Sequence, residues 1–274
     1  MASERTRAAL LSLILLVLGL GIWELGSRTS DVPVTSDTSG LIANSDQLAR
    51  LPRPSEIIAF AWEQLRDPFY DRGTNDKGVG VQLAYSLARV LTGYLIGLCL
   101  AVPLGFVIGM SRVLMAALDP FIQVLRPISP LAWMPLALFV IRDSALASIF
   151  VICVCSLWPT LINTAFGVSS VSRDYLNVAR TLELSRLRIA LTVILPAAAP
   201  TILTGMRISI GISWLVIVAA EMLVGGTGIG YYVWNEWNNL DLNAVVFSVL
   251  CIGVVGMLLD RVLARIGAWV SYQS

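Results

Sequence analysis

The segment SRDYLNVARTLELSRLRIALTVILPAAAP, Ser172 to Pro200, decides the fold. It lies between two long apolar stretches, and its charged side chains are Arg173, Asp174, Arg180, Glu183, Arg186 and Arg188. Its apolar side chains recur at helical spacing in two groups, Tyr175, Val178, Ala179 and Leu182, and then Leu184, Leu187, Leu191 and Ile194. This pattern predicts two short amphipathic helices joined near Glu183 to Ser185, with Pro196 ending the second.

The composition is that of a membrane protein. Of 274 residues, 57% are hydrophobic and 14% are charged, whereas soluble domains average roughly 45–50% apolar and about 25% charged residues. The net charge of +1 excludes a polybasic nucleic-acid-binding protein, so no nucleic-acid partner is expected. The chain has no histidine, and its four cysteines lie in apolar stretches. We therefore expect neither a metal site nor a catalytic dyad.

Six stretches approach the about 20 apolar residues that cross a bilayer. They are residues 8–23, 90–110, 113–141, 145–171, 200–220 and 242–259, of which the third is interrupted by Asp119, Arg126 and four prolines. In the second, small residues recur at every fourth position, namely Gly93, Gly97, Ala101, Gly105 and Gly109. Such a face lets helix backbones approach closely in lipid, so we expect this helix to be central.

Arginine positions predict the orientation, because cytoplasmic loops are enriched in Lys and Arg. With both termini in the cytoplasm, the short internal segments hold nine arginines and the short external loops hold only Arg142. The segment from Ser172 is then cytoplasmic. We interpret residues 1–26 as an N-terminal transmembrane helix rather than a signal peptide, because no small-x-small cleavage site follows.

Residues 27–82 form the external segment in this topology. A helix is predicted from Pro54 onward, with Ser55 as its N-cap. Its apolar positions Ile57, Ile58, Ala61, Trp62 and Leu65 share one face. The pattern leaves two roles open for this face. It contacts the outer surface of the membrane lipid, or it packs against the other helices.

The charged cytoplasmic segment has two interpretations at this level. An amphipathic helix pair whose ends connect to two spans suits docking into a groove on a soluble partner. Alternatively, the segment is a solvated loop whose arginines only set the topology. The pattern alone leaves both open.

The segment resembles the cytoplasmic coupling loop, called the EAA loop, of ABC-importer permeases. The family pattern is Glu-Ala-Ala, three residues, Gly, nine residues, then Ile-x-Leu-Pro, and this chain keeps the spacing and the final Leu195-Pro196. Asn177 replaces Glu, Val178 replaces Ala and Glu183 replaces Gly. Because a left-handed turn costs a non-glycine residue on the order of 1 kcal/mol or more, we expect a differently built turn or a dedicated partner.

The resemblance implies that this loop contacts an ATP-binding subunit. Arg180 is the expected ionic contact. The expected contact surface is Asn177, Val178, Ala179, Arg180, Thr181, Leu182, Glu183 and Leu184.

The resemblance extends over nearly the whole chain. LPRPSEIIAFAW, SLARVLTGYLIGLCLAVPLGFVIGMS, LDPFIQVLRPISPLAWMPLALFV and WPTLINTAFGV look like successive blocks of the nitrate/sulfonate/bicarbonate permease family. The block GMRISIGISWLVIVAAEMLVGGTGIGYYVWNEWNNL is the most specific, and it is nearest the nitrate members. The resemblance implies an all-α membrane protein with about six transmembrane helices and the type I ABC importer permease fold. Its permease core is expected at residues 83–274 and its coupling loop at residues 172–196.

The same resemblance implies an assembly. It consists of a homodimer in the bacterial inner membrane, two cytoplasmic ATP-binding subunits that are often different proteins, and a periplasmic or lipid-anchored solute-binding protein. The chain itself is not expected to be an enzyme, because Lys77, its one lysine, lies outside any Gly-x4-Gly-Lys-Ser/Thr frame. ATP and magnesium are therefore expected on the partner subunits, and no cofactor on this chain.

The GGTGIG motif at Gly225–Gly230 superficially resembles a dinucleotide-binding loop. It follows a predicted transmembrane helix rather than a strand, so a flexible external hairpin is predicted instead. An intramembrane enzyme is disfavoured by the missing histidine, and an ion-coupled secondary transporter by the position of the acids at the ends of the spans.

Ionisable residues at membrane depth are candidates for the translocation pathway. The guanidinium groups of Arg126 and Arg207 suit a small oxyanion. An alternative for Arg207 is an ion pair with Asp260 or Glu183, and an alternative for Arg126 is the capping of a broken helix. Apolar gates are conceivable at Trp133, Met134 and Trp214.

Glu221 would repel an anion, so we interpret it as a structural partner of the 225–239 loop and as the mate of Arg89 in an ion pair. The function that follows is ATP-driven import of a small inorganic anion, with nitrate or nitrite first. Bicarbonate, cyanate and sulfonates are the alternatives.

Overall fold

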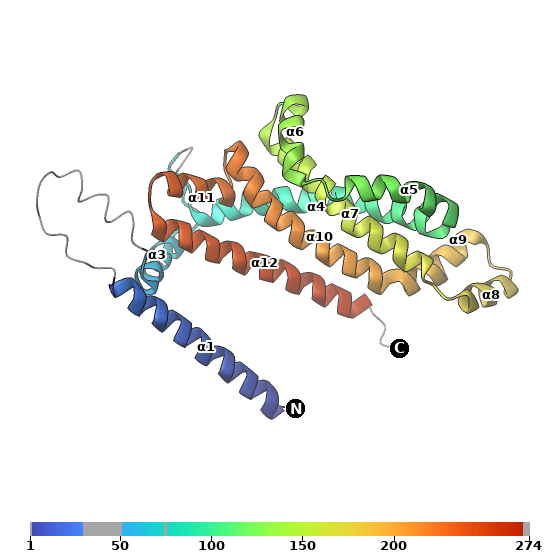
Figure 1. Ribbon diagram of the computed structural model, residues 1–274, viewed down its shortest axis with the longest axis horizontal. Coiled ribbons are helices and arrows are strands. Elements are labelled where there is room, and N and C mark those ends of the chain that lie inside the picture. Colours follow the sequence, from blue (N-terminus) through green and yellow to red (C-terminus); the bar gives the residue numbers. More distant parts are fainter. Residues whose placement is uncertain (1, 30–50, 74–75, 271–274) are drawn as a thin grey trace, which may run out of the picture. The chain divides into compact units, whose positions relative to one another are not determined.

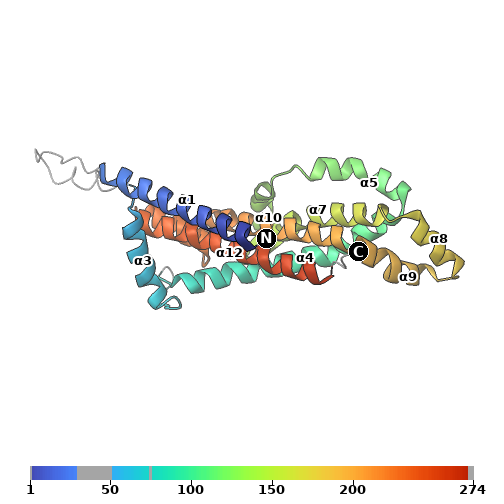
Figure 2. The ribbon, with the colours of Figure 1, turned by 90° about the horizontal axis from the view of Figure 1, so that it is seen from below.

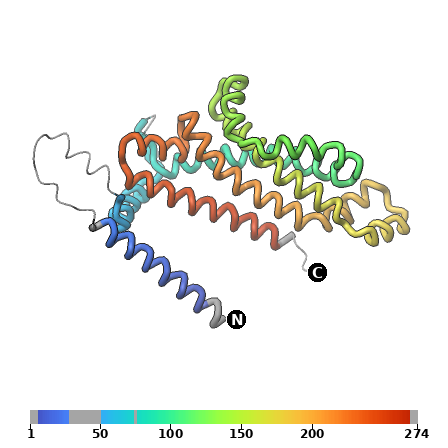
Figure 3. Tube along the Cα trace, viewed as in Figure 1, coloured from blue at the N-terminus to red at the C-terminus, as the bar shows by residue number. Residues whose placement is uncertain are grey.

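The computed structural model describes residues 2–29, 51–73 and 76–270 (Figures 1 and 3). In these ranges every regular element is a helix and no strand occurs. The elements are α1 (Ala2–Thr29), α3 (Pro54–Arg66), α4 (Val79–Met110), α5 (Arg112–Leu125), η1 (Pro130–Trp133), α6 (Met134–Ile141), α7 (Ser144–Ser169), α8 (Arg173–Thr181), α9 (Arg186–Ile189), η2 (Ala190–Ile194), α10 (Leu195–Val224), α11 (Ile229–Asn238) and α12 (Leu242–Val270). Two compact units make up the chain, residues 1–79 with 233–250 and residues 80–232 with 251–274.

Within the described residues, five helices are long and apolar enough to cross a membrane. A sixth span results if α5 is counted together with η1 and α6, which are bent by 83° relative to it. The bend falls at Pro127 and Pro130, where proline removes a backbone donor and restricts the residue before it. The predicted set of about six spans is therefore confirmed, and the third is the broken one.

Helix α4 packs in parallel along α7 through its small residues. Gly93 lies against Ile149, Gly105 against Leu161 and Gly109 against Ala165. A Cβ atom added to Gly105 would lie 2.7 Å from the carbonyl oxygen of Leu161, a separation that real side chains do not tolerate. The predicted close-packing face of α4 is confirmed, and its reason is the direct contact of two helix backbones.

Helix α10 runs antiparallel to α7 in the same unit. Buried polar side chains join the two helices: the Thr160 hydroxyl donates to Ser209 Oγ over 3.0 Å, and Cys155 Sγ lies 3.7 Å from Ser213 Oγ. Lipid tails are as apolar as leucine, so packing and buried hydrogen bonds hold such helices together.

Pro196 does not end the second cytoplasmic helix, contrary to the prediction. Arg186 to Val224 forms one continuous helical stretch of 39 residues, in which Ala190–Ile194 is a π-helix. A π-helical turn is wider than an α-helical turn, and this one immediately precedes the first turn of α10, where a proline is tolerated. The prediction failed because a local widening of the helix accommodated the proline.

In the unit of residues 1–79 and 233–250, α3 begins at Pro54, and Ser55 is not its N-cap. The N-cap is Arg53, whose backbone N–H donates to Glu56 Oε2 over 3.0 Å. Proline is well suited to the first helical position, and this shifts Ser55 into the first turn. There the Ser55 hydroxyl donates to Glu24 Oε2 of α1 over 3.2 Å.

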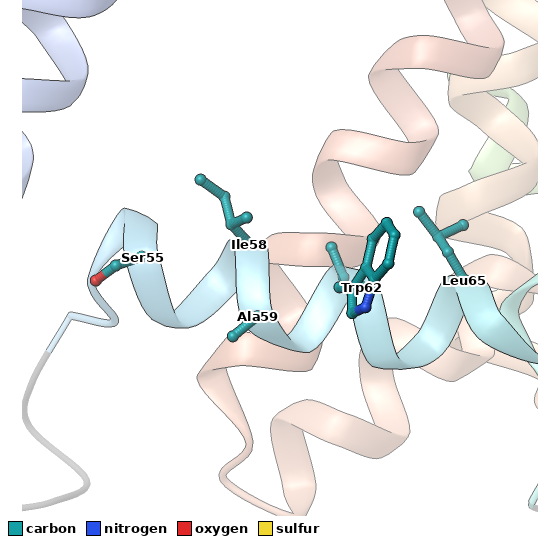
Figure 4. A pocket seen from close by; sticks show the side chains of 6 residues that line it. Ser55, Ile58, Ala59, Trp62 and Leu65 are labelled. Carbon is teal, nitrogen blue, oxygen red and sulfur yellow. The ribbon is translucent and has the colours of Figure 1, made fainter.

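The apolar residues of α3 lie on two adjacent sides rather than one. Ile57 is buried, and the Phe60 ring meets that of Phe247 edge-on, with 5.7 Å between centroids. The neighbouring side is exposed and lines a shallow depression (Figure 4). Its lining residues are Ser55, Ile58, Ala59, Ala61, Trp62 and Leu65.

The backbone contact of α4 with α7 predicts the effect of a single methyl group. Gly105→Ala should lower the stability of the detergent-solubilised protein by about 1–3 kcal/mol, because the methyl group has no room against Leu161. Gly253→Ala is the matched control, since no atom lies within 4 Å of the added Cβ. Thermal unfolding followed by tryptophan fluorescence measures both. Equal melting temperatures for the two variants would contradict the packing argument.

Candidate functional site

Helices α8 and α9 form a hairpin at the end of the α7–α10 pair (Figure 2). Each helix begins with a serine cap. Ser172 Oγ accepts from the backbone N–H of Asp174 over 3.2 Å, and Ser185 Oγ accepts from that of Arg188 over 3.4 Å. The predicted helix pair is present, with its turn at the predicted place.

Glu183 adopts the left-handed conformation at this turn, with φ of 54°. The backbone N–H of Glu183 donates to Arg180 O over 2.9 Å, and that of Leu184 donates to Ala179 O over 3.2 Å. These two bonds make a Schellman motif with Glu183 in the position that glycine usually takes. The turn therefore has the same backbone conformation as a glycine-containing turn, and the first alternative of the prediction, a differently built turn, is wrong. Glu183 adopts the left-handed conformation at an energetic cost that glycine would not have.

The hairpin has a packed side and an exposed apolar side. Leu176 and Ile189 pack against the cluster formed by Val168, Ile194, Ala198 and Ile202, and Ala179 is also buried. Tyr175, Val178 and Leu182 point the other way, with 62%, 60% and 66% of their surface exposed. The sequence pattern placed Ala179 on the same side as these three residues, but Ala179 lies on the packed side of the hairpin. Of the other expected contact residues, Asn177, Arg180, Thr181 and Glu183 are exposed and Leu184 is half-buried.

At the other end of α10, Glu221 is buried to 1% exposure and pairs with Arg89. Arg89 Nη1 lies 2.8 Å from Glu221 Oε1 and also donates to the carbonyl of Thr227 over 2.7 Å. The Ser86 hydroxyl donates to Glu221 Oε2 over 2.7 Å. The carboxylate is thus compensated by a guanidinium and a hydroxyl, as a buried charge requires.

The GGTGIG turn is not a loose hairpin, contrary to the prediction. The backbone N–H groups of Gly228, Ile229 and Gly230 donate to Gln82 Oε1, Ser86 Oγ and Glu221 Oε2 over 2.7, 2.8 and 3.1 Å. Gly225 and Gly226 have positive φ values, 77° and 94°, which suit glycine. The first turn of α11 is held by side chains of α4 and α10.

Sequence reasoning missed Gln82 and Ser86 in this cluster. Their signal is the spacing with Arg89: the three residues fall at i, i+4 and i+7, on one side of α4. Such a polar row at the start of an otherwise apolar helix indicates that the helix binds polar groups of a neighbouring segment.

The pathway candidates lie in different surroundings. Arg207 pairs with Asp260 through two bonds of 2.5 and 2.6 Å, and it does not reach Glu183. Trp214 is buried, and its indole N–H donates to Ile252 O over 2.9 Å. Met134 is buried with Ala147 and Val151 of α7.

The two remaining candidates lie around the bend. Trp133 is half-buried at the end of η1 and packs against the cluster that contains Met134. Arg126 is exposed directly after α5, and its backbone N–H donates to Ile122 O over 2.9 Å. Among the five candidates, Arg126 is the one whose charged group is exposed without an ion-pair partner in the described residues.

Residues 101–272 match the family of binding-protein-dependent transport system inner membrane components. The chain belongs to this family. The permease is therefore a multi-pass inner membrane protein. The α8–α9 hairpin and Glu221 lie inside the matched region, whereas Arg89 precedes it. Permeases of such importers work with ATP-binding subunits and substrate-binding proteins.

Named relatives of the permease are similar over most of their length. The nitrate import permease protein NrtB of Leptolyngbya laminosa is 46% identical over 216 residues, which cover 79% of this chain and 77% of that protein. NrtB of Synechocystis is 43% identical over 220 residues, covering 80% of both chains. The bicarbonate transport system permease protein CmpB of Synechococcus elongatus is 43% identical over 234 residues, covering 84% of both.

Solved structures show the fold of the permease. A chain of the MetNI methionine ABC transporter in an inward-facing conformation superimposes with a TM-score of 0.61 at 15% identity, covering 69% of this chain and 94% of that one. An amino acid ABC transporter crystallised with histidines gives a TM-score of 0.55 at 14% identity, with 86% and 99% covered. The permease therefore has the type I ABC importer fold, as predicted.

The Glu221 cluster predicts a charge-specific loss of stability. Glu221→Gln keeps the size of the side chain but leaves the Arg89 guanidinium, 15% exposed, without its counter-charge, and breaking a buried pair costs about 3–5 kcal/mol. Asp71→Asn is the control, because its 3.1 Å pair with Lys77 involves a 55% exposed carboxylate and exposed pairs contribute about 0–1 kcal/mol. Thermal unfolding in detergent compares the two.

The double variant Arg89→Gln/Glu221→Gln tests the cause of that loss. It should recover part of the stability, because neither charge is then buried alone. A double variant less stable than Glu221→Gln would show that the ion pair is not the reason.

Proposed function

We propose that this permease is the membrane-spanning subunit of an ATP-driven importer for a small inorganic oxyanion, with nitrate as the first candidate. The similarity to the nitrate import permease protein of Leptolyngbya laminosa, 46% over 216 residues, carries the proposal. Bicarbonate is the second candidate, because the bicarbonate permease of Synechococcus elongatus is similar over a slightly longer stretch at 43%. Both ions are small, planar and singly charged, so the same kind of passage suits either.

In this proposal ATP and magnesium are bound by two partner subunits, identical or different, and the permease carries no cofactor. A second copy of the permease completes the passage, and a periplasmic or lipid-anchored binding protein delivers the anion. The hairpin α8–α9 and both termini lie in the cytoplasm, which follows from the nine arginines of the internal segments.

The α8–α9 hairpin is the coupling element of this assembly. Its exposed row of Tyr175, Val178 and Leu182 offers an apolar contact, and Arg180 adds a charge at its edge. Helix α9 continues through the π-helical turn into α10, so a displacement of the hairpin moves α10 with it. Closure of the ATP-binding subunits would then switch the passage between its inward- and outward-facing states.

Uptake of labelled anions tests the substrate. A strain that lacks the gene should lose high-affinity uptake of labelled nitrate, and the chain supplied in trans should restore it while excess bicarbonate competes only weakly. Loss of bicarbonate uptake with normal nitrate uptake would favour the second candidate. Transport by this chain alone in liposomes without ATP would contradict an ATP-driven importer altogether.

Charge reversal at the hairpin tests the coupling. In the purified complex, Arg180→Glu should reduce the ATP hydrolysis that the loaded binding protein stimulates by roughly tenfold, the equivalent of losing one charged hydrogen bond of about 1.5–3 kcal/mol. Arg265→Glu, an exposed arginine outside the hairpin, should leave the stimulation within twofold, roughly the effect of an exposed charge. Equal stimulation in both variants would place the contact elsewhere.

A further inference from the structure

Helix α5 has three different sides, and one of them is unusual for a membrane helix. On the first side, α5 packs against the spans α4 and α7. The packed residues are Leu114, Met115, Leu118 and Ile122, which contact a buried cluster of Ala101, Ile108, Leu161 and Ala165. This contact holds α5 alongside two membrane-spanning helices over about two and a half of its turns.

The second side of α5 is exposed and apolar. Val113, Phe121 and Val124 have 80%, 64% and 67% of their surface exposed, and exposed Ala117 lies between them. At 3.6 residues per turn these positions form one strip along the helix. A strip of this kind is what contact with lipid tails or with another apolar surface requires.

The third side is also exposed, but it is polar. It consists of Arg112, Ala116, Asp119, Gln123 and Arg126, all of them exposed. The Gln123 side-chain amide donates to Asp119 Oδ2 over 2.5 Å, whereas the guanidinium of Arg126 has no ion-pair partner in the part of the chain that the structure describes. Two arginines against one aspartate leave this side with a positive charge.

Because α5 packs along the spans α4 and α7, we place its polar side within the depth of the bilayer. The 14 residues of α5 extend over about 21 Å, since each residue of an α-helix adds about 1.5 Å. This is about two thirds of the roughly 30 Å hydrocarbon layer of a bilayer. Charged groups facing lipid at this depth cost several kcal/mol each, so they face water or protein.

We propose that the polar side of α5, formed by Asp119, Gln123 and Arg126 with Arg112 at its cytoplasmic end, lines the water-filled passage of the importer, and that Arg126 binds the oxyanion there. The substrate class rests on the proposed function. A guanidinium presents a planar fork of donors that matches a planar oxyanion, and the Arg126 fork is not engaged by an acid. Asp119, which would repel an anion, is held by Gln123.

The composition of this side favours a passage over a dry contact with a second copy. The centres of protein interfaces are depleted in charged residues and rich in large apolar ones, yet the apolar member of the polar side is Ala116. Every one of the five N–H donors of Arg126 would need an acceptor in a dry contact. Water and a passing anion supply these acceptors without a fixed partner.

Two adjacent cysteine variants test the passage. In a functional background without the four native cysteines, Gln123→Cys and Val124→Cys replace exposed neighbours on the polar and apolar sides. A charged, membrane-impermeant methanethiosulfonate reagent, applied to the assembled complex in membranes, should modify Gln123→Cys roughly tenfold faster or more, because the reactive thiolate forms in water and not in lipid. Equal rates, or a faster reaction at Val124→Cys, would overturn the proposal.

A disulfide-linked dimer of Gln123→Cys without modification by the reagent would also overturn it, since that side would then be a contact between copies. These outcomes are independent of the substrate. If nitrate uptake fails but the labelling difference holds, the passage stands and the proposed substrate is wrong.

The role of Arg126 needs a separate measurement. Arg126→Gln should lower nitrate uptake by roughly tenfold or more, the loss of one charge-assisted hydrogen bond, at unchanged abundance of the complex. Arg126→Lys should retain part of the uptake and weaken the discrimination between nitrate and chloride, because lysine keeps the charge but not the planar fork. Unchanged uptake by Arg126→Gln would remove this residue from the passage.

Discussion

A polar group at the depth of the lipid tails has no water to bind, and this constraint governs most of the structure. It requires the backbone to be helical in every span, because a helix satisfies its own N–H and C=O groups. It also requires each charged side chain in a span to find a partner. Glu221 finds Arg89 and Ser86, and Arg207 finds Asp260. On the polar side of α5, Arg126 has no ion-pair partner among the described residues.

The same constraint explains how the helices hold together. Apolar burial gives little advantage in lipid, so contact distance and hydrogen bonding become decisive. The glycines of α4 bring its backbone against that of α7, and the hydroxyls of Thr160 and Ser209 join α7 to α10. Hydrogen bonds also hold the turn after α10. Its backbone N–H groups donate to the side chains of Gln82, Ser86 and Glu221.

Much of this arrangement follows from the sequence, because it depends on local patterns. The apolar stretches gave the spans, the four-residue spacing of glycines gave the packed face of α4, and the charged segment gave the hairpin. The errors have physical causes that one sequence does not display. A π-helical turn accommodates Pro196, Pro54 displaces Ser55 from the cap, and distant side chains fix a glycine-rich turn that looked loose.

The candidate site was predictable to a similar degree. The hairpin and its exposed row follow from helical spacing, although the inward position of Ala179 depends on how α8 packs against α7 and α10. The acid–base pair of Arg89 and Glu221 was suggested by charge alone. Arg126 was predicted as a pathway candidate, but the polar side of α5 as a group was not, because its members are separated by apolar residues and come together only when the helix is formed and its packed side is known.

The left-handed Glu183 has a consequence for recognition between subunits. In the coupling-loop pattern that this chain resembles, glycine at this position leaves the tip of the loop without a side chain, whereas here the exposed side chain of Glu183 occupies the tip. An ATP-binding subunit whose surface fits a glycine at the tip would have to bury the negative charge of Glu183. A subunit that places a cationic side chain there would bind this hairpin more tightly. In a cell with several related importers, the strained Glu183 would then match this permease to its own ATP-binding subunit.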